Sequence, residues 1–166
     1  MDIYIVDSNF FIQAHRAIYP LDIAFSFWSK VKQLADEEKI VSIDKVKCEI
    51  YDKNDALEAW CIANLPNDFF KDTSQVMSEY SKVSGWAISK SNHYNTNALN
   101  EFLDAEEADA FLVAYALADL NKRIIVTQEV SDPNRKNKIK IPEACKAFQV
   151  KFVNTIDMFR KLGETF

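Results

Sequence analysis

Glycine is the residue type that this sequence most clearly lacks. The chain has 166 residues but only two glycines, Gly85 and Gly163, where average usage would give about twelve. Loops that hold phosphates through backbone N–H groups need two or three glycines in close succession, because Cβ atoms would keep the backbone away from the phosphate. The sequence therefore excludes a Rossmann-type dinucleotide site and a Walker A loop.

Cysteine and long apolar runs are also scarce. The three cysteines, Cys48, Cys61 and Cys145, are odd in number and show no C-x-x-C spacing, so they indicate neither a disulfide framework nor a zinc site. We expect free thiols in a reducing cytoplasm. No stretch approaches about 18 uninterrupted apolar residues, and Asp2 follows Met1, so we expect no membrane-spanning helix and no signal peptide.

The remaining composition is that of an ordinary folded domain. Apolar residues make up 48% and charged residues 27% of the chain, and 25 acids against 20 bases give a formal charge of −5. This length fits one domain, residues 1–166, with a single core.

The order of apolar patterns predicts strands that alternate with helices. Short apolar runs predict extended segments at residues 3–6, 40–43, 123–127 and 150–153. Helical patterns cover residues 10–17, 22–39, 44–50, 55–65, 69–87 and 108–120, and a further helix starts near Pro142. Asp44 and Asp55 are predicted to cap the helices that follow them. Residues 88–97 are polar and predict a loop. The alternation predicts an α/β fold with a mostly parallel central sheet.

Four acids fall where such a sheet places its ligand site, beyond the carboxyl ends of the strands. Asp7 follows the first strand, and Glu49 lies on the helix after residues 40–43. Asp109 opens the apolar helix, and Glu129 follows the strand that ends at Thr127. Carboxylates are the ligands that Mg²⁺ and Mn²⁺ prefer. The pattern therefore predicts a divalent-metal site.

Each acid also has a purely structural interpretation when it is taken alone. Asp7 can act only as a helix cap, and Glu49 can pair with Lys53 one helical turn away. Asp109 can complement the dipole of its helix, and Glu129 can be an ordinary loop acid. The combination of the four, in this strand order, is what favours a functional site.

Five short segments carry a family resemblance that covers nearly the whole chain. They are IYIVDSNFFI at 3–12, VKCEI at 46–50, ADAFLVA at 108–114, IVTQE at 125–129 and KIPEAC at 140–145. With these segments the chain resembles PIN-domain nucleases. It is similar in particular to the toxin-type proteins of bacterial toxin–antitoxin pairs and to a less characterised PIN-like branch, for which the last segment looks like a signature.

The resemblance implies a three-layer α/β/α PIN-like fold and a metal-dependent ribonuclease. Its catalytic, metal-binding acids would be Asp7, Glu49, Asp109 and Glu129, holding Mg²⁺ or Mn²⁺. The side chains of Asn9 and Thr127 would support these acids by hydrogen bonds. Cleavage of RNA would leave 5′-phosphate and 3′-hydroxyl ends.

The fourth acid departs from the family pattern. Many toxin-type members have Asp where this chain has Glu129, and Asp132 lies close by as a competitor. Either residue therefore stays open as the fourth acid at this point, as does the number of metal ions. Each close pair of carboxylates costs about 4 kcal/mol at an effective dielectric constant of about 20, so we expect divalent ions to relieve strain at the site.

The partners expected from the sequence are RNA and protein. A basic stretch with Arg135, Lys136, Lys138 and Lys140 follows the strand at 123–127 and is a candidate for contacts with RNA phosphates; the alternative is a solvated charged loop. The resemblance implies a cognate antitoxin that blocks the acidic groove. It also implies a homodimer, for which the helical hairpin at 22–65 is a candidate surface.

Two other functions compete with the nuclease. A non-catalytic PIN-fold module that binds a protein would satisfy most of the chain equally well. An aspartyl-nucleophile phosphatase would also place an Asp after the first strand, but that class wants a second Asp where this chain has Asn9, which counts against it.

Overall fold

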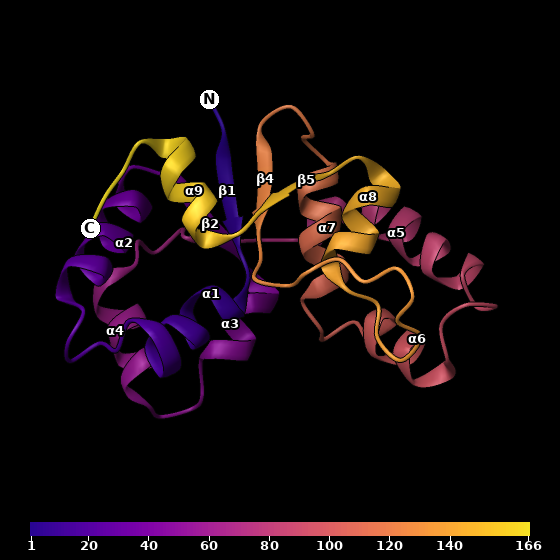
Figure 1. Ribbon diagram of the computed structural model, residues 1–166, viewed down its shortest axis with the longest axis horizontal. Coiled ribbons are helices and arrows are strands. Elements are labelled where there is room, and N and C mark those ends of the chain that lie inside the picture. Colours follow the sequence, from indigo (N-terminus) through magenta and orange to yellow (C-terminus); the bar gives the residue numbers. More distant parts are fainter.

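The computed structural model describes residues 1–166 and contains five parallel strands between two layers of helices (Figure 1). The strands are β1 (Ile3–Val6), β2 (Ile40–Ile43), β3 (Phe70–Lys71), β4 (Arg123–Val126) and β5 (Lys151–Val153), in the order β3-β2-β1-β4-β5. The predicted α/β/α class is therefore confirmed, and the sheet is parallel throughout. The central strand is β1.

The two helical layers use different halves of the chain. Figure 1 shows the first layer, together with the C-terminal helix, on the left of the sheet. It consists of α1 (Ser8–Gln13), the π-helical turn η1 (Ala14–Ile18), α2 (Phe25–Asp36), α3 (Asp44–Ile50), α4 (Ala56–Asn64) and α9 (Thr155–Leu162). The second layer contains the short 3₁₀ turn η2 (Ser74–Val76), α5 (Met77–Ser89), α6 (Thr96–Leu103), α7 (Asp109–Leu117) and α8 (Ile141–Phe148).

Helix α7 is the central helix of the second layer, as its apolar sequence predicts. Six of its nine residues are buried, and the helix contacts β4, α5 and α8. A helix that is apolar on every side must be covered on every side. This position fixes the direction of α7, so its first residue, Asp109, lies beside the end of β1 rather than in solvent.

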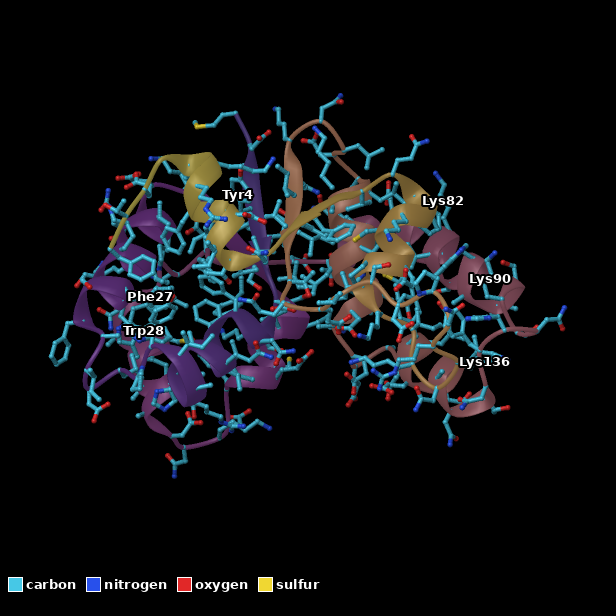
Figure 2. The ribbon with its side chains drawn as sticks, viewed as in Figure 1. Tyr4, Phe27, Trp28, Lys82, Lys90 and Lys136 are labelled. Atoms are coloured by element: carbon cyan, nitrogen blue, oxygen red, sulfur yellow. The ribbon has the colours of Figure 1, made fainter.

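An aromatic cluster fills the first layer. The ring of Phe27 stacks on Tyr19 at 4.3 Å and also meets Trp28, Phe159 and Phe166. Figure 2 shows Phe27 and Trp28 inside the left half of the molecule. These contacts tie α2 to α9. Phe27, Trp28 and Phe159 belong to the buried core, whereas Phe166 is 43% exposed at its edge.

Three local predictions are wrong. Residues 69–87 do not form one helix, because Phe70 pairs with Ser42 as part of β3 and α5 begins only at Met77. Asp44 does not cap α3 from outside; it is the first helical residue, and its carboxylate accepts hydrogen bonds from the N–H of Lys45 and the hydroxyl of Thr73.

The predicted loop at 88–97 is also shorter than expected, since α6 already starts at Thr96. Asn95 caps this helix by accepting a hydrogen bond from the N–H of Ala98. A strand of only two residues has no periodicity, and the cap at Asn95 lies in a uniformly polar run, so neither is apparent from the sequence. As for membranes, none of the helices combines the length and the apolar character needed to cross one.

Candidate active site

Asp7 is the most deeply buried of the predicted acids. It follows β1 directly and caps α1, its Oδ1 accepting a 2.9 Å hydrogen bond from the N–H of Phe10. Only 4% of the residue is exposed. Burial raises the pKa of Asp7 to about 7, the hydrogen bond from Phe10 opposes the shift, and the nearby charge of Glu129 adds to it. The capping role and a functional role therefore coexist in one side chain.

Asp109 faces the same region from the first turn of α7. Burial raises its pKa to about 8, the charge of Glu129 raises it further, and the charge of Lys138 opposes the shift. Asp7 and Glu49 contribute smaller repulsions to the same carboxyl. The four predicted acids thus act electrostatically on one another. Asp7 is buried and Asp109 partly buried, and an ionised carboxylate without a cation is unfavourable in such surroundings.

Glu49 is oriented by a serine. The hydroxyl of Ser8 donates a 2.7 Å hydrogen bond to Glu49 Oε2, which joins α1 to α3. The alternative pair with Lys53 is not formed. Ser8 is 8% exposed and Glu49 is partly exposed, so the bond is partly buried. Sequence reasoning missed Ser8, because nothing local links it to a residue so far along the chain.

Glu129 is held by groups of its own loop. Its Oε2 accepts a 2.8 Å hydrogen bond from the N–H of Ile141, and its Oε1 lies 3.3 Å from Lys138 Nζ. Asp132, the competing acid, is exposed, and its N–H donates to Glu143 instead. Glu129 and not Asp132 is therefore the fourth acid of the cluster.

The two predicted supporting residues behave differently. Thr127 is 2% exposed; its hydroxyl accepts a 3.1 Å hydrogen bond from the N–H of Glu129 and lowers the pKa of Asp7. The side chain of Asn9, in contrast, makes no hydrogen bond to any of the four acids. The predicted support from Asn9 is therefore not found, and Ser8 takes this role.

The arrangement of the four acids can be compared with what the predicted metal ion requires. The structure contains no group of three or more His, Cys, Asp or Glu side chains already arranged to hold an ion. Glu49 and Glu129 are instead turned toward protein donors. The buried Asp7 and the partly buried Asp109 remain as oxygen donors whose pKa values are raised. Such a pair suits a hard divalent cation, which would relieve the burial penalty of both carboxylates.

The predicted RNA-binding bases do not form one surface. Arg135 and Lys136 are exposed, and Figure 2 shows Lys136 beside α6. Lys138 reaches into the acidic cluster, and Lys140 Nζ donates to the carbonyl of Val130 at 3.1 Å. Only the first two bases are thus directed to solvent.

A polar cleft of about 570 Å³ opens next to Glu129. It lies between the loop after β4, the end of β5 and one side of α9. Its walls include two bases, Arg160 and Lys161, and the partly buried ring of Phe152. Neither base stands out in the sequence, because both lie in an ordinary amphipathic helix.

Comparison with known proteins identifies a family. No curated protein and no solved structure matches the chain. The sequence does match the family described as "Domain of unknown function (DUF4411)" from residue 4 to residue 166. This match includes every strand except the first residue of β1, and all four acids of the cluster. The chain therefore belongs to the DUF4411 family.

Proposed function

We propose that this protein is a divalent-metal-dependent endoribonuclease that hydrolyses phosphodiester bonds of RNA. The observation that carries the proposal is the position of two acids, Asp7, which is buried after β1, and Asp109, which is partly buried at the start of α7, in one cluster with Glu49 and Glu129. Stability alone does not account for two neighbouring carboxyls whose pKa values are raised to about 7 and about 8. The resemblance to PIN-domain nucleases points to the same residues.

The cluster would hold Mg²⁺ or Mn²⁺ through Asp7 and Asp109, with Glu49 as the third carboxylate. The bound ion would supply activation of water and stabilisation of charge on the phosphate oxygens. Ser8 keeps Glu49 in orientation, and Thr127 does the same for the strand end that carries Asp7. In the reaction an oxygen of water bonds to phosphorus as the bond to the 3′-oxygen breaks, and a proton ends on that oxygen. The products are a 5′-phosphate and a 3′-hydroxyl.

Substrate binding would use the cleft beside Glu129. Its bases, Arg160 and Lys161, line the cleft together with Glu129 and suit the phosphates of a single strand, and Arg160 also pairs with Asp157 at 3.1 Å. Arg135 and Lys136 are exposed in the loop after β4 and offer further phosphate contacts. A negatively charged protein can bind RNA in this way because Arg160 and Lys161 both line the cleft that Glu129 borders.

The wider biological role is inferred from the resemblance to toxin-type PIN proteins. In that role the protein is the toxin of a bacterial toxin–antitoxin pair and acts in the cytoplasm. Its cognate antitoxin covers the acidic groove. The candidate dimer surface at 22–65 includes a groove of about 450 Å³ between α2 and α4, lined by Phe25, Trp28 and Trp60.

A second candidate function, a non-catalytic protein-binding module, is favoured by the same apolar surface. Phe25 is 67% and Ile62 64% exposed, and large exposed apolar side chains of this kind are typical of interaction sites. A module of this type does not need the acidic cluster. Divalent ions should therefore stabilise a nuclease but not a binding module.

The deciding experiment is RNA cleavage in Mg²⁺ or Mn²⁺ by the parent protein and by Asp7→Asn and Asp109→Asn. We expect each substitution to reduce cleavage by about 100-fold or more. Asp132→Asn is the matched control, because this nearby carboxylate is exposed and outside the cluster, and it should cleave like the parent. Equal cleavage by all four proteins would overturn the nuclease proposal. A melting temperature unaffected by Mn²⁺, with a neutral Asp109→Asn, would favour the binding module.

A further inference from the structure

A lysine side chain lies inside the acidic cluster. Lys138 Nζ is 3.3 Å from Glu129 Oε1, and the side chains of these residues are 34% and 14% exposed. The same lysine lines a small closed space together with Asp109, Glu101 and Glu107. One ammonium group therefore stands among carboxylates from α6, α7 and the loop after β4.

The backbone around Lys138 fixes the position of this ammonium. The next residue, Ile139, is 2% exposed and belongs to the hydrophobic core. On one side the carbonyl of Lys136 accepts a 2.8 Å hydrogen bond from the N–H of Asn95. On the other side the N–H of Ile141 donates to the same Glu129 that pairs with Lys138. The backbone around Lys138 is therefore held by these hydrogen bonds and by the buried Ile139, while its ammonium group pairs with Glu129.

Both carboxylate oxygens of Glu129 already interact with groups of the protein. One of its carboxylate oxygens takes the Ile141 N–H and the other faces Lys138 Nζ. In nucleases with two metal ions, the ions lie about 4 Å apart, and each needs its own carboxylates. Here the carboxylate that would hold the second ion, that of Glu129, is already paired with the positive charge of Lys138. A divalent ion at that place would also be repelled by the ammonium.

We propose that Lys138 is a built-in cation of the acidic site, which takes the place of a second divalent ion. Each chain then binds one divalent ion, through Asp7 and Asp109, and Glu129 holds Lys138 instead of a metal. This inference rests on the proposed metal-dependent function and specifies its stoichiometry. It also gives Lys138 a role in charge balance, rather than the contact with RNA that its place in a basic stretch suggests.

The test is a titration of the full-length, metal-free protein with Mn²⁺. Binding is measured by calorimetry and by the electron paramagnetic resonance signal of free Mn²⁺. The variants are Lys138→Met, which keeps the length of the side chain without its charge, and Lys138→Arg, which keeps the charge. Lys136→Met is the matched control, since it removes an exposed lysine of the same loop.

We expect one Mn²⁺ per chain for the parent, Lys136→Met and Lys138→Arg, and two for Lys138→Met, the second binding within about tenfold of the first. Two ions on the parent, or one ion on a folded Lys138→Met, would overturn the role of Lys138 and leave the nuclease proposal intact. No Mn²⁺ on the parent, or binding unchanged in Asp7→Asn, would overturn the proposed metal site itself. If Lys138→Met does not fold, Lys138→Gln takes its place and the same stoichiometries decide.

Discussion

The hydroxyl of Ser8 donates a 2.7 Å hydrogen bond to Glu49 Oε2, across 41 residues of sequence. Ser8→Ala removes the donor that orients this carboxylate. We expect Mn²⁺ affinity to fall about tenfold, as for other partners that orient metal-binding side chains, while the free energy of unfolding falls by only about 1 kcal/mol. Calorimetric titration and urea unfolding measure the two effects.

Ser78→Ala provides the control for this prediction. Ser78 also donates to a glutamate, Glu79, but on the exposed side of α5. Its removal should leave metal affinity unchanged. A Ser8→Ala protein with the affinity of the parent would show that Glu49 does not depend on this bond.

The raised pKa values of Asp7 and Asp109 predict how stability varies with pH. Both acids keep their protons to higher pH in the folded protein, to about 7 and about 8, than in the unfolded chain. Folding stability from these groups is therefore complete below about pH 4 and is lost as the pH rises toward about 8. Without metal, Asp109→Asn should be more stable than the parent at pH 8, by on the order of 2 kcal/mol.

Urea unfolding in EDTA at several pH values checks this expectation. The difference between variant and parent reports on the cluster alone, because acids elsewhere whose pKa values are lowered, such as Glu58 and Glu164, are common to both proteins. The difference between Asp109→Asn and the parent should vanish near pH 4. If the difference in the free energy of unfolding stays constant with pH, the raised pKa of Asp109 is contradicted.

Two phenylalanines of α2 give a stability prediction for the fold itself. Phe27 is 1% exposed at the centre of the aromatic cluster, whereas Phe25, two residues earlier, borders the groove on α2 and α4. Phe27→Ala should destabilise the protein by about 3–5 kcal/mol, because it leaves a cavity in the core. Phe25→Ala should change the free energy of unfolding by less than about 0.5 kcal/mol. Thermal and urea unfolding distinguish the two, and similar losses would place Phe25 in the core as well.

RNA binding should depend on the bases of the cleft beside Glu129. The double substitution Arg160→Gln and Lys161→Gln should weaken binding of single-stranded RNA and reduce the slope of log affinity against log salt by about one for each phosphate that is no longer neutralised. Lys82→Gln is the control, since Lys82 is exposed on α5, at the upper right of Figure 2. An unchanged salt slope would remove the cleft from the RNA-binding surface, and the same double substitution at Arg135 and Lys136 would test the alternative.

The sequence predicts the frame of this fold well, and the reason is physical. The runs at 3–6 and 123–126 are apolar and β-branched because these strands are covered on both faces, and the structure has them side by side as β1 and β4. Strand β3 could not be predicted, since two residues have no periodicity and are paired only through β2. Its existence depends on tertiary contacts.

The candidate site, like the fold, is predictable from the sequence only in part. The proximity of the four acids follows from strand ends that meet at one edge of the sheet. The hydrogen bond from Ser8 to Glu49 and the ion pair of Lys138 with Glu129 depend on how loops return to that edge. Asn9 shows that closeness in sequence does not determine hydrogen-bond partners either. It is two residues from Asp7, yet its side chain forms no hydrogen bond with any acid of the cluster. Local sequence determines which residues reach the edge, but not the partners that they find there.

The central position of β1 has a consequence for the newly made chain. Strand β1 can pair with β4 only after the more than 100 residues between the two strands have been synthesised. Until then β1 has an open edge, and Asp7 and Glu49 lack Asp109, Glu129 and Lys138. Such distant parallel pairing is slow to form. The proposed nuclease therefore cannot act before Glu129 and Lys138 have been synthesised and β4 has paired with β1.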